Sequence, residues 1–215
     1  MQIIDAALPL GTAVLNAART CVESGGTLVF PTDTVYGIGC DPENGAAVDA
    51  VYAAKKRPAE KPLAIHLAQP ADARRYAMLS PAARAVIERL WPGPVAIVAL
   101  REPGVCDAAA RWGATISLRC PASDACAAIL RATGALAATS ANVSGRPAFT
   151  GAPDEFDRLP DATLAVITGP TFAGRESTVV DCTEDPIRIL REGALSRQAI
   201  EAALRGSGVA LRSSY

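Results

Sequence analysis

Short apolar segments of two kinds alternate along almost the whole chain, and this alternation constrains the fold more than any other feature. Eight short runs have the length and composition of β-strands: residues 27–31, 63–67, 95–100, 115–119, 135–139, 164–168, 178–181 and 187–190. Between them, apolar residues recur at helical spacing around residues 14–22, 48–52, 83–90, 126–130 and 200–204. The alternation predicts an α/β domain built around one twisted sheet.

Three serines mark expected helix starts within this pattern. Ser80 stands before a proline, and Ser123 and Ser196 precede two further helical segments. A serine hydroxyl at this position accepts a hydrogen bond from a backbone N–H that the first helical turn leaves unpaired. Because several strand-like runs are separated by only a turn, we expect a mostly mixed or antiparallel sheet flanked by helices, not a purely parallel one.

The length and composition are typical of one globular domain. The chain has 215 residues, of which 50% are hydrophobic and 20% charged, and it contains no repeat or linker-like stretch. We expect residues 1–206 to form the domain and residues 207–215 a C-terminal tail. The longest apolar run, residues 95–100, is far shorter than the ~20 residues of a membrane-spanning helix. The N-terminus has no secretion-signal pattern, so we expect a cytoplasmic protein without membrane contact.

The sequence lacks the histidine and cysteine patterns that bind zinc. The chain has one histidine, His66, and six cysteines without CxxC spacing, which argues against a zinc site. We therefore predict no metal site in the protein, and reduced, mostly buried cysteines. The net charge is −1, so the overall charge does not indicate a nucleic-acid-binding protein. Any site for an anionic ligand must be a local cluster of cations.

Polar side chains gather at the ends of the strand-like runs. The clusters lie at residues 31–37, 139–145, 175–178 and 190–193, and Arg119 ends the run 115–119. Any one of them can be a surface turn, because Asp, Thr, Ser and Asn side chains satisfy turn backbones. Together they are consistent with one large polar cleft, since loops at strand ends carry the binding residues of α/β folds.

A cation cluster at residues 55–61 is open to two interpretations. Lys55, Lys56, Arg57 and Lys61 stand within seven residues, and Pro58 ends the preceding helix. The cations can simply complement the negative end of that helix. Alternatively they bind phosphate, in which case the side chains of Lys55, Arg57 and Lys61 must do so themselves, because a helix C-terminus repels anions.

Six of these segments, taken in order, resemble the YrdC-like family, the L-threonylcarbamoyladenylate synthases. They are PTDTVYGIGCD, KKRPAEKPLAIHL, ATISLRCP, TSANVSGRP, ESTVVD and ILREG, and the resemblance runs from about residue 10 to about residue 205. It implies a YrdC-like fold with a large basic concave cleft, in the short, single-domain form of the family. One departure is Glu192, where the family more often has proline.

The resemblance also implies a reaction and roles for residues. L-threonine, bicarbonate or CO2, and ATP with Mg²⁺ form threonylcarbamoyl-AMP and pyrophosphate, without a tightly bound cofactor. A tRNA threonylcarbamoyl-transferase complex then uses the product to modify tRNA beside the anticodon. Lys55 and Arg57 are the expected catalytic residues. The expected ATP-binding residues are Lys55, Arg57, Lys61, Ser117, Ser140, Asn142 and Arg191, and the expected threonine-binding residues are Thr34, His66, Arg119, Ser140 and Ser177.

Two other functions fit parts of the sequence. A non-catalytic module for double-stranded RNA or tRNA could use a basic concave face, and the enzyme itself could contact such RNA. The near-neutral net charge and the neutral donors beside the cations argue against RNA binding as the main role. A related carbamoyl-transfer domain acting on carbamoyl phosphate usually belongs to a much longer chain with zinc-binding cysteines, a pattern that is missing from this sequence.

Overall fold

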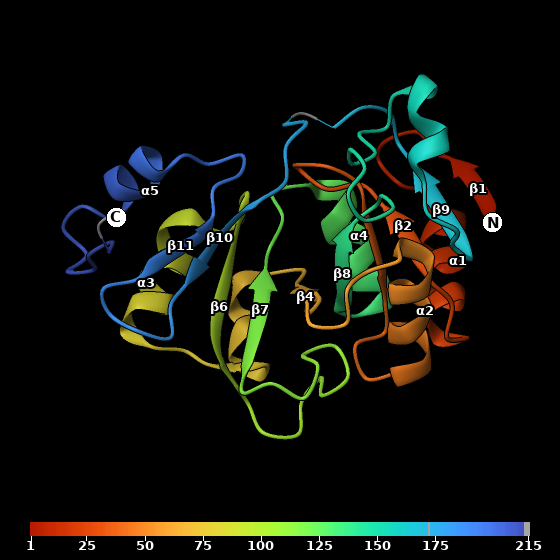
Figure 1. Ribbon diagram of the computed structural model, residues 1–215. Coiled ribbons are helices and arrows are strands. Elements are labelled where there is room, and N and C mark those ends of the chain that lie inside the picture. Colours follow the sequence, from red (N-terminus) through yellow and green to blue (C-terminus); the bar gives the residue numbers. More distant parts are fainter. Residues whose placement is uncertain (172, 213–215) are drawn as a thin grey trace.

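The computed structural model describes residues 1–171 and 173–212. Within these residues the chain forms one sheet of eleven strands (Figure 1). The strands are β1 (Gln2–Asp5), β2 (Leu28–Phe30), β3 (Gly37–Cys40), β4 (Ala64–His66), β5 (Ala77–Met78), β6 (Val95–Arg101), β7 (Thr115–Arg119), β8 (Leu136–Ser140), β9 (Leu164–Ile167), β10 (Thr178–Asp181) and β11 (Arg188–Arg191). The helices are α1 (Thr12–Glu23), α2 (Gly45–Lys55), α3 (Pro81–Leu90), α4 (Asp124–Thr133) and α5 (Arg197–Leu204), with short 3₁₀ helices η1 (Pro70–Arg75) and η2 (Pro153–Arg158).

The sheet is mixed, as the sequence predicts. Its strand order is β1-β9-β2-β3-β8-β4-β7-β6-β10-β11, and β5 pairs with β6. Four neighbouring pairs are parallel, β1/β9, β2/β9, β4/β7 and β6/β10, and the other described pairs are antiparallel. All eight strand-like runs and all five helical segments are confirmed. The hydroxyls of Ser80, Ser123 and Ser196 accept the expected capping bonds from backbone N–H groups.

The sequence pattern did not reveal β1, β3 and β5. The strand β3 has the sequence GIGC, and glycine is depleted in strands because it has no side chain to pack. Here the glycines make room for neighbours. A β-carbon at Gly37 would lie 3.0 Å from the ring of Phe30, and one at Gly39 would lie 2.9 Å from the β-carbon of Ala138. Tertiary packing therefore stabilises a strand that local propensity disfavours.

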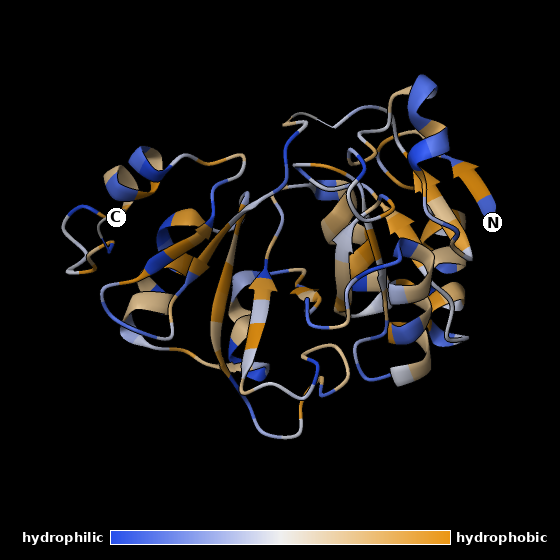
Figure 2. Cartoon of the chain, in the orientation of Figure 1, coloured by the Kyte–Doolittle hydropathy of each residue, from blue (hydrophilic) through white to orange (hydrophobic). Residues whose placement is uncertain are grey.

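Alternate residues of the strands feed two hydrophobic cores on opposite faces of the sheet. Leu28 and Phe30 of β2 pack in one core with residues of α1 and α4, whereas Val29 between them lies in the other core. That second core is the larger of the two, and it includes residues of α2, α3 and α5. Hydrophobic residues are concentrated in the strands (Figure 2). All six cysteines are buried and unpaired, which confirms the expected burial.

The end of the described chain packs on the domain. The backbone N–H of Ile187 donates to Ala210 at 2.9 Å, and that of Arg212 donates to Ile187 at 2.8 Å. Val209 and Leu211 pack against the larger core. Residues 213–215 of the predicted tail lie outside the described residues, and the boundary after residue 206 stays a prediction. Within the described part of the chain, no helix is long and apolar enough to cross a membrane.

Candidate active site

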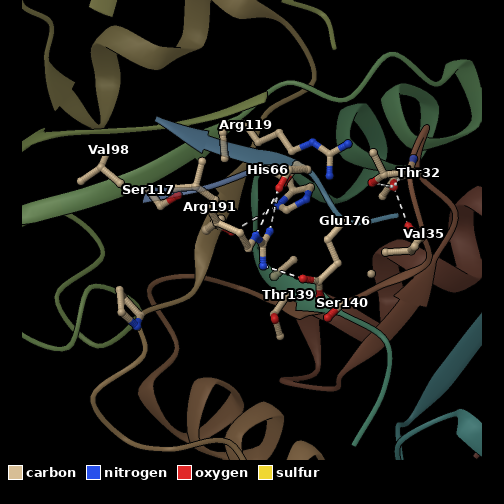
Figure 3. A pocket seen from close by; sticks show the side chains of 18 of the residues that line it. Thr32, Val35, His66, Val98, Ser117, Arg119, Thr139, Ser140, Glu176 and Arg191 are labelled. Carbon is tan, nitrogen blue, oxygen red and sulfur yellow. Dashed lines mark hydrogen bonds and ion pairs between the residues drawn. The ribbon is translucent and has the colours of Figure 1, made fainter. Parts of the chain in front are cut away.

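One face of the central strands forms the floor of a cavity. The alternation of side chains along these strands sends one set into the larger core, including Ile65, Ile97 and Leu118. The other set lines a cavity of about 260 Å³: Ala64 and His66 of β4, Ala96 and Val98 of β6, Ser117 and Arg119 of β7, and Val179 of β10. In the sheet register His66 lies beside Arg119, and Ala64 beside Ser117. We call this the smaller cavity (Figure 3).

A larger cavity of about 760 Å³ adjoins it. The two cavities share lining residues, so they form one cleft with two chambers. The shared residues are Val35, Arg57, Ser140, Glu176 and Arg191. Among the described residues, seven cations line the larger cavity, namely Lys55, Arg57, Lys61, Arg146, Arg158, Arg175 and Arg191. Three carboxylates oppose them, those of Glu155, Glu176 and Glu192. The balance of charge in this chamber suits an anionic ligand.

Arg119 reaches the smaller cavity as a deeply buried cation. The residue is 4% exposed, and its Nη2 donates to Oδ1 of Asp33 at 2.5 Å. Burial lowers the pKa of Arg119, and the charge of Asp33 opposes that effect. The Nε of Arg119 and Oδ2 of Asp33 are both buried without a hydrogen-bond partner. Arg119 therefore holds a buried N–H group that has no acceptor within the described protein.

His66 lies beside Arg119 as a neutral imidazole. Its Nδ1 lies 3.2 Å from the carbonyl oxygen of Ala64, and the ring of Phe30 meets its ring edge-on with centroids 5.9 Å apart. Burial, reinforced by the charge of Arg119, lowers the pKa of His66 to about 3. At neutral pH this side chain can donate or accept a hydrogen bond, but it brings no charge to the cavity.

Buried hydroxyl groups complete the smaller cavity. Thr34 is fully buried, and its hydroxyl lies 3.1 Å from that of Thr32, which donates to the carbonyl of Val35 at 2.5 Å. Ser177, which precedes β10, is also buried and lines the cavity. These buried groups can recognise a small polar ligand by hydrogen bonds.

Lys55 is occupied by the protein itself. It is 1% exposed at the C-terminal end of α2, and its Nζ donates to the carbonyl oxygens of Ser140 and Asn142 and to Oδ1 of Asn142. The hydroxyl of Ser140 donates to the same Oδ1 at 2.7 Å. Burial lowers the pKa of Lys55 to about 8, with help from the charge of Arg57 and opposition from Glu176. The lysine thus fixes the loop that leaves β8, which carries two predicted ATP ligands.

Arg57 lies at the junction of both chambers. Its Nε donates to the carbonyl of Lys61 at 3.0 Å, its Nη2 to that of Pro62 at 2.9 Å, and its Nη1 to the hydroxyl of Thr139 at 3.2 Å. Lys61 itself is exposed at the rim. Three directed hydrogen bonds hold the planar guanidinium in place, so the charge at the junction is fixed in position before a ligand binds.

Across the junction, Arg191 forms an ion pair with Glu176. Nη1 of Arg191 lies 2.5 Å from Oε2 of Glu176, and its Nη2 donates to the carbonyl of Ser177 at 2.9 Å. The labelled side chains of Figure 3 show this pair between His66 and Ser140. Glu192, next in the chain, lines the larger cavity, and its Oε2 lies 3.4 Å from the backbone N–H of Arg197.

Every residue that the sequence assigned to ligand binding lines this cleft. The smaller cavity includes Thr34, Arg57, His66, Ser117, Arg119, Ser140, Ser177 and Arg191, and the larger includes Lys55, Arg57, Lys61, Ser140, Asn142 and Arg191. Their individual roles stay predictions. Sequence reasoning did not assign roles to Asp33 and Glu176, although both stand in the polar clusters at strand ends. No group of three His, Cys, Asp or Glu side chains suited to a metal ion occurs in the described ranges.

The fold and the cleft define a mixed-sheet α/β protein with a two-chambered cleft, whose larger chamber is lined by seven cations among the described residues. Residues 20–193 match the Sua5/YciO/YrdC family model, which carries the description "Telomere recombination". The chain therefore belongs to the Sua5/YciO/YrdC family.

Three similar proteins extend this finding. The threonylcarbamoyl-AMP synthase of Bacillus subtilis (strain 168) is 32% identical over 191 residues, which cover 87% of this chain and 55% of that protein. A putative threonylcarbamoyl-AMP synthase of Mycobacterium leprae (strain TN) is 34% identical over 208 residues, covering 94% of each chain. The crystal structure of P. abyssi Sua5 complexed with L-threonine is 30% identical, with a TM-score of 0.88 over 99% of this chain and 63% of that chain. The chain thus spans about half the length of the first of these relatives and less than two thirds of the P. abyssi chain.

Proposed function

We propose that this protein is an L-threonylcarbamoyl-AMP synthase, which forms threonylcarbamoyl-AMP and pyrophosphate from L-threonine, bicarbonate or CO2, and ATP. The observation that carries the proposal is the joined pair of cavities. A polar chamber of about 260 Å³ opens onto a cation-lined chamber of about 760 Å³. The two substrates differ as the two chambers do, because an amino acid is small and polar, whereas a nucleotide is larger and carries several negative charges. The L-threonine complex of the P. abyssi relative supports this assignment.

In this proposal the smaller cavity binds L-threonine. Arg119 binds the carboxylate, because a guanidinium matches a carboxylate with parallel N–H donors, and Asp33 keeps one of its N–H groups occupied. Thr34, His66, Ser140 and Ser177 bind the hydroxyl and amine of the substrate. The neutral imidazole of His66 suits this task, since a second buried cation beside Arg119 would be unfavourable.

The larger cavity binds the triphosphate of ATP. Arg57, Lys61 and Arg191 supply cations, and Ser140 and Asn142 supply neutral hydrogen-bonding groups. Ser117, which the family resemblance assigns to ATP, lines the smaller cavity instead. The three hydrogen bonds of Lys55 to residues 140 and 142 give it a positioning role: it holds the loop against which the phosphates lie. Mg²⁺ enters with ATP, as a companion of the triphosphate. This proposal requires no tightly bound cofactor.

The reaction needs no protein nucleophile. The amine of threonine adds to the carbon of CO2 and releases a proton to solvent, which yields a carbamate. A carbamate oxygen then attacks the α-phosphorus of ATP, and the bond between that phosphorus and the oxygen of the β-phosphate breaks, so that pyrophosphate leaves. The protein contributes position and charge neutralisation, as in other transfers of phosphoryl and nucleotidyl groups. The fixed guanidinium of Arg57 is suited to neutralise charge at the α-phosphate.

The product is a mixed anhydride, which a tRNA threonylcarbamoyl-transferase complex would consume to modify tRNA beside the anticodon. Direct contact with tRNA or double-stranded RNA belongs to the same proposal. The activity named for the relatives favours a synthase over an RNA-binding module without catalysis.

Pyrophosphate release tests the proposal. Purified protein with ATP, Mg²⁺ and bicarbonate should release pyrophosphate when L-threonine is added, and release should fall to background without L-threonine or without bicarbonate. Salt-sensitive binding of double-stranded RNA without any ATP turnover would instead favour the binding module.

A further inference from the structure

The ion pair of Glu176 and Arg191 stands at the boundary between the two cavities. Nη1 of Arg191 lies 2.5 Å from Oε2 of Glu176, and the side chains are 47% and 38% exposed respectively. Both residues line both cavities. Ligands in either chamber can therefore reach the pair. We call it the boundary pair.

Each member of the boundary pair has the charge that one substrate needs. Among the described residues that line both chambers, Glu176 is the one acid, and it stands with the cations Arg57 and Arg191. The ammonium group of an amino acid seeks a carboxylate, and the phosphates of a nucleotide seek a guanidinium. In the ligand-free protein these two groups neutralise each other. The ammonium group of one substrate must therefore compete with Arg191 for Glu176, and the phosphates of the other must compete with Glu176 for Arg191.

The proposed function fixes which substrate meets which member, and the inference rests on it. Arg119 lines the smaller cavity alone, so a carboxylate bound there lies in the chamber's interior. The amine must then face the shared boundary, because the carbamate formed on it attacks a nucleotide in the larger cavity. The ammonium group of the incoming amino acid consequently faces Glu176, while the phosphates face Arg191.

We propose that the boundary pair couples the two binding sites by exchanging partners. When L-threonine binds, its ammonium group replaces Arg191 as the partner of Glu176, and Arg191 becomes available to phosphate. When ATP binds first, its phosphates engage Arg191 and release Glu176 for the ammonium group. The first ligand breaks the pair and the second does not have to, so each ligand strengthens the binding of the other. Linkage requires the same factor in both directions.

Calorimetry with an inert nucleotide measures this coupling. α,β-Methylene-ATP binds as ATP does but cannot release pyrophosphate, because carbon bridges its α- and β-phosphorus atoms. Saturating L-threonine should tighten its binding to the wild-type protein by about tenfold, within the usual range for coupled sites. In Glu176→Gln, which keeps the size of the side chain but not its charge, the nucleotide alone should bind more tightly than to wild type. The effect of L-threonine should fall to about twofold or less.

Glu192→Gln is the matched control. It removes the same charge from the lining of the larger cavity, next to Arg191 in the chain, but its carboxylate faces the backbone of Arg197. Nucleotide affinity should rise modestly in this variant, and the tenfold coupling should persist. The proposal is overturned if wild type shows no coupling, if Glu176→Gln keeps it, or if both variants lose it equally. Failure of the proposed function would differ, because then wild type would bind neither L-threonine nor the nucleotide, and the coupling would fall with it.

Discussion

Arg119 and Asp33 form a buried ion pair through a single hydrogen bond of 2.5 Å, from Nη2 of the arginine to Oδ1 of the aspartate. Their side chains are 5% and 11% exposed. The pair joins the loop after β2 to the end of β7, and it places a guanidinium on the wall of the smaller cavity. A cation can be held there because a carboxylate compensates for most of its lost hydration.

Removing the carboxylate should therefore destabilise the fold. Asp33→Asn leaves Arg119 buried without its counter-charge, which should lower the free energy of unfolding by about 3 kcal/mol. Urea unfolding at neutral pH measures it. The control is Glu201→Gln, which breaks the ion pair of Arg197 and Glu201 on α5; that change should cost no more than about 0.5 kcal/mol.

A double variant separates the charge effect from a packing effect. Asp33→Asn combined with Arg119→Met leaves no buried charge unpaired, so it should be more stable than Asp33→Asn alone. If the double variant unfolded more easily than Asp33→Asn, the unpaired charge of Arg119 would not be the source of the destabilisation.

His66 should stay neutral throughout the physiological pH range. Burial and the charge of Arg119 lower its pKa to about 3, and the chain has no other histidine. The ring therefore gives a unique NMR signal, whose chemical shift should not titrate between pH 5 and 8. A midpoint near the ordinary value of about 6.5 would contradict the prediction.

The same shift makes stability depend on pH. Between pH 6.5 and about 3 the unfolded chain binds a proton on His66 that the folded protein does not. Stability is therefore lost as the pH falls through this window. His66→Gln should remove that part of the acid sensitivity, so the two unfolding curves should converge toward pH 4. Parallel curves for wild type and variant would rule out His66 as the source.

Arg57 should be required for nucleotide binding. Arg57→Ala removes a cation shared by both chambers, and charge-assisted hydrogen bonds of this kind are each worth about 1.5–3 kcal/mol, so ATP affinity should fall by about tenfold or more. Arg57→Lys should recover only part of it, because lysine cannot reproduce the three-bonded planar fork. Lys56→Gly is the control: it removes an adjacent exposed charge and keeps the positive φ of 50° at that position. Equal losses in Arg57→Ala and Lys56→Gly would indicate a general charge effect.

The sequence predicted the elements of the fold well where local signals agree. Period-two runs, helical spacing and serine caps such as Ser80 all act over a few residues, and each of these elements is present. The strand β3 was not predictable in this way. Its glycines are explained by the ring of Phe30 and by Ala138, a strand neighbour about a hundred residues distant in the chain, and no local pattern reports such a contact.

The site shows the same division between local and distant information. The family resemblance implied that the cations Arg57, Arg119 and Arg191 bind ligands, and their places in polar clusters agreed with it. Their protein partners were not predicted, because the carboxylates that pair with Arg119 and Arg191 lie 86 and 15 residues away in the sequence. Lys55 illustrates the consequence. It stands in a cluster of cations suited to phosphate, but its Nζ donates to oxygen atoms of Ser140 and Asn142. The sequence does not reveal such contacts.

The choice of amino acid tests the polar lining of the smaller cavity. Thr34, His66 and Ser177 are buried there, and a pocket that hydrogen-bonds the hydroxyl of threonine leaves such groups unpaired when valine enters. Sites of this kind reject the analogue by about 10⁴-fold. Serine keeps the hydroxyl and loses one methyl, worth about 1–3 kcal/mol, so it should be a poor but measurable substrate. Pyrophosphate release at saturating ATP and bicarbonate should follow the order threonine, serine, valine. If valine matched threonine, or if release were equal without an amino acid, the assignment of this cavity would be wrong.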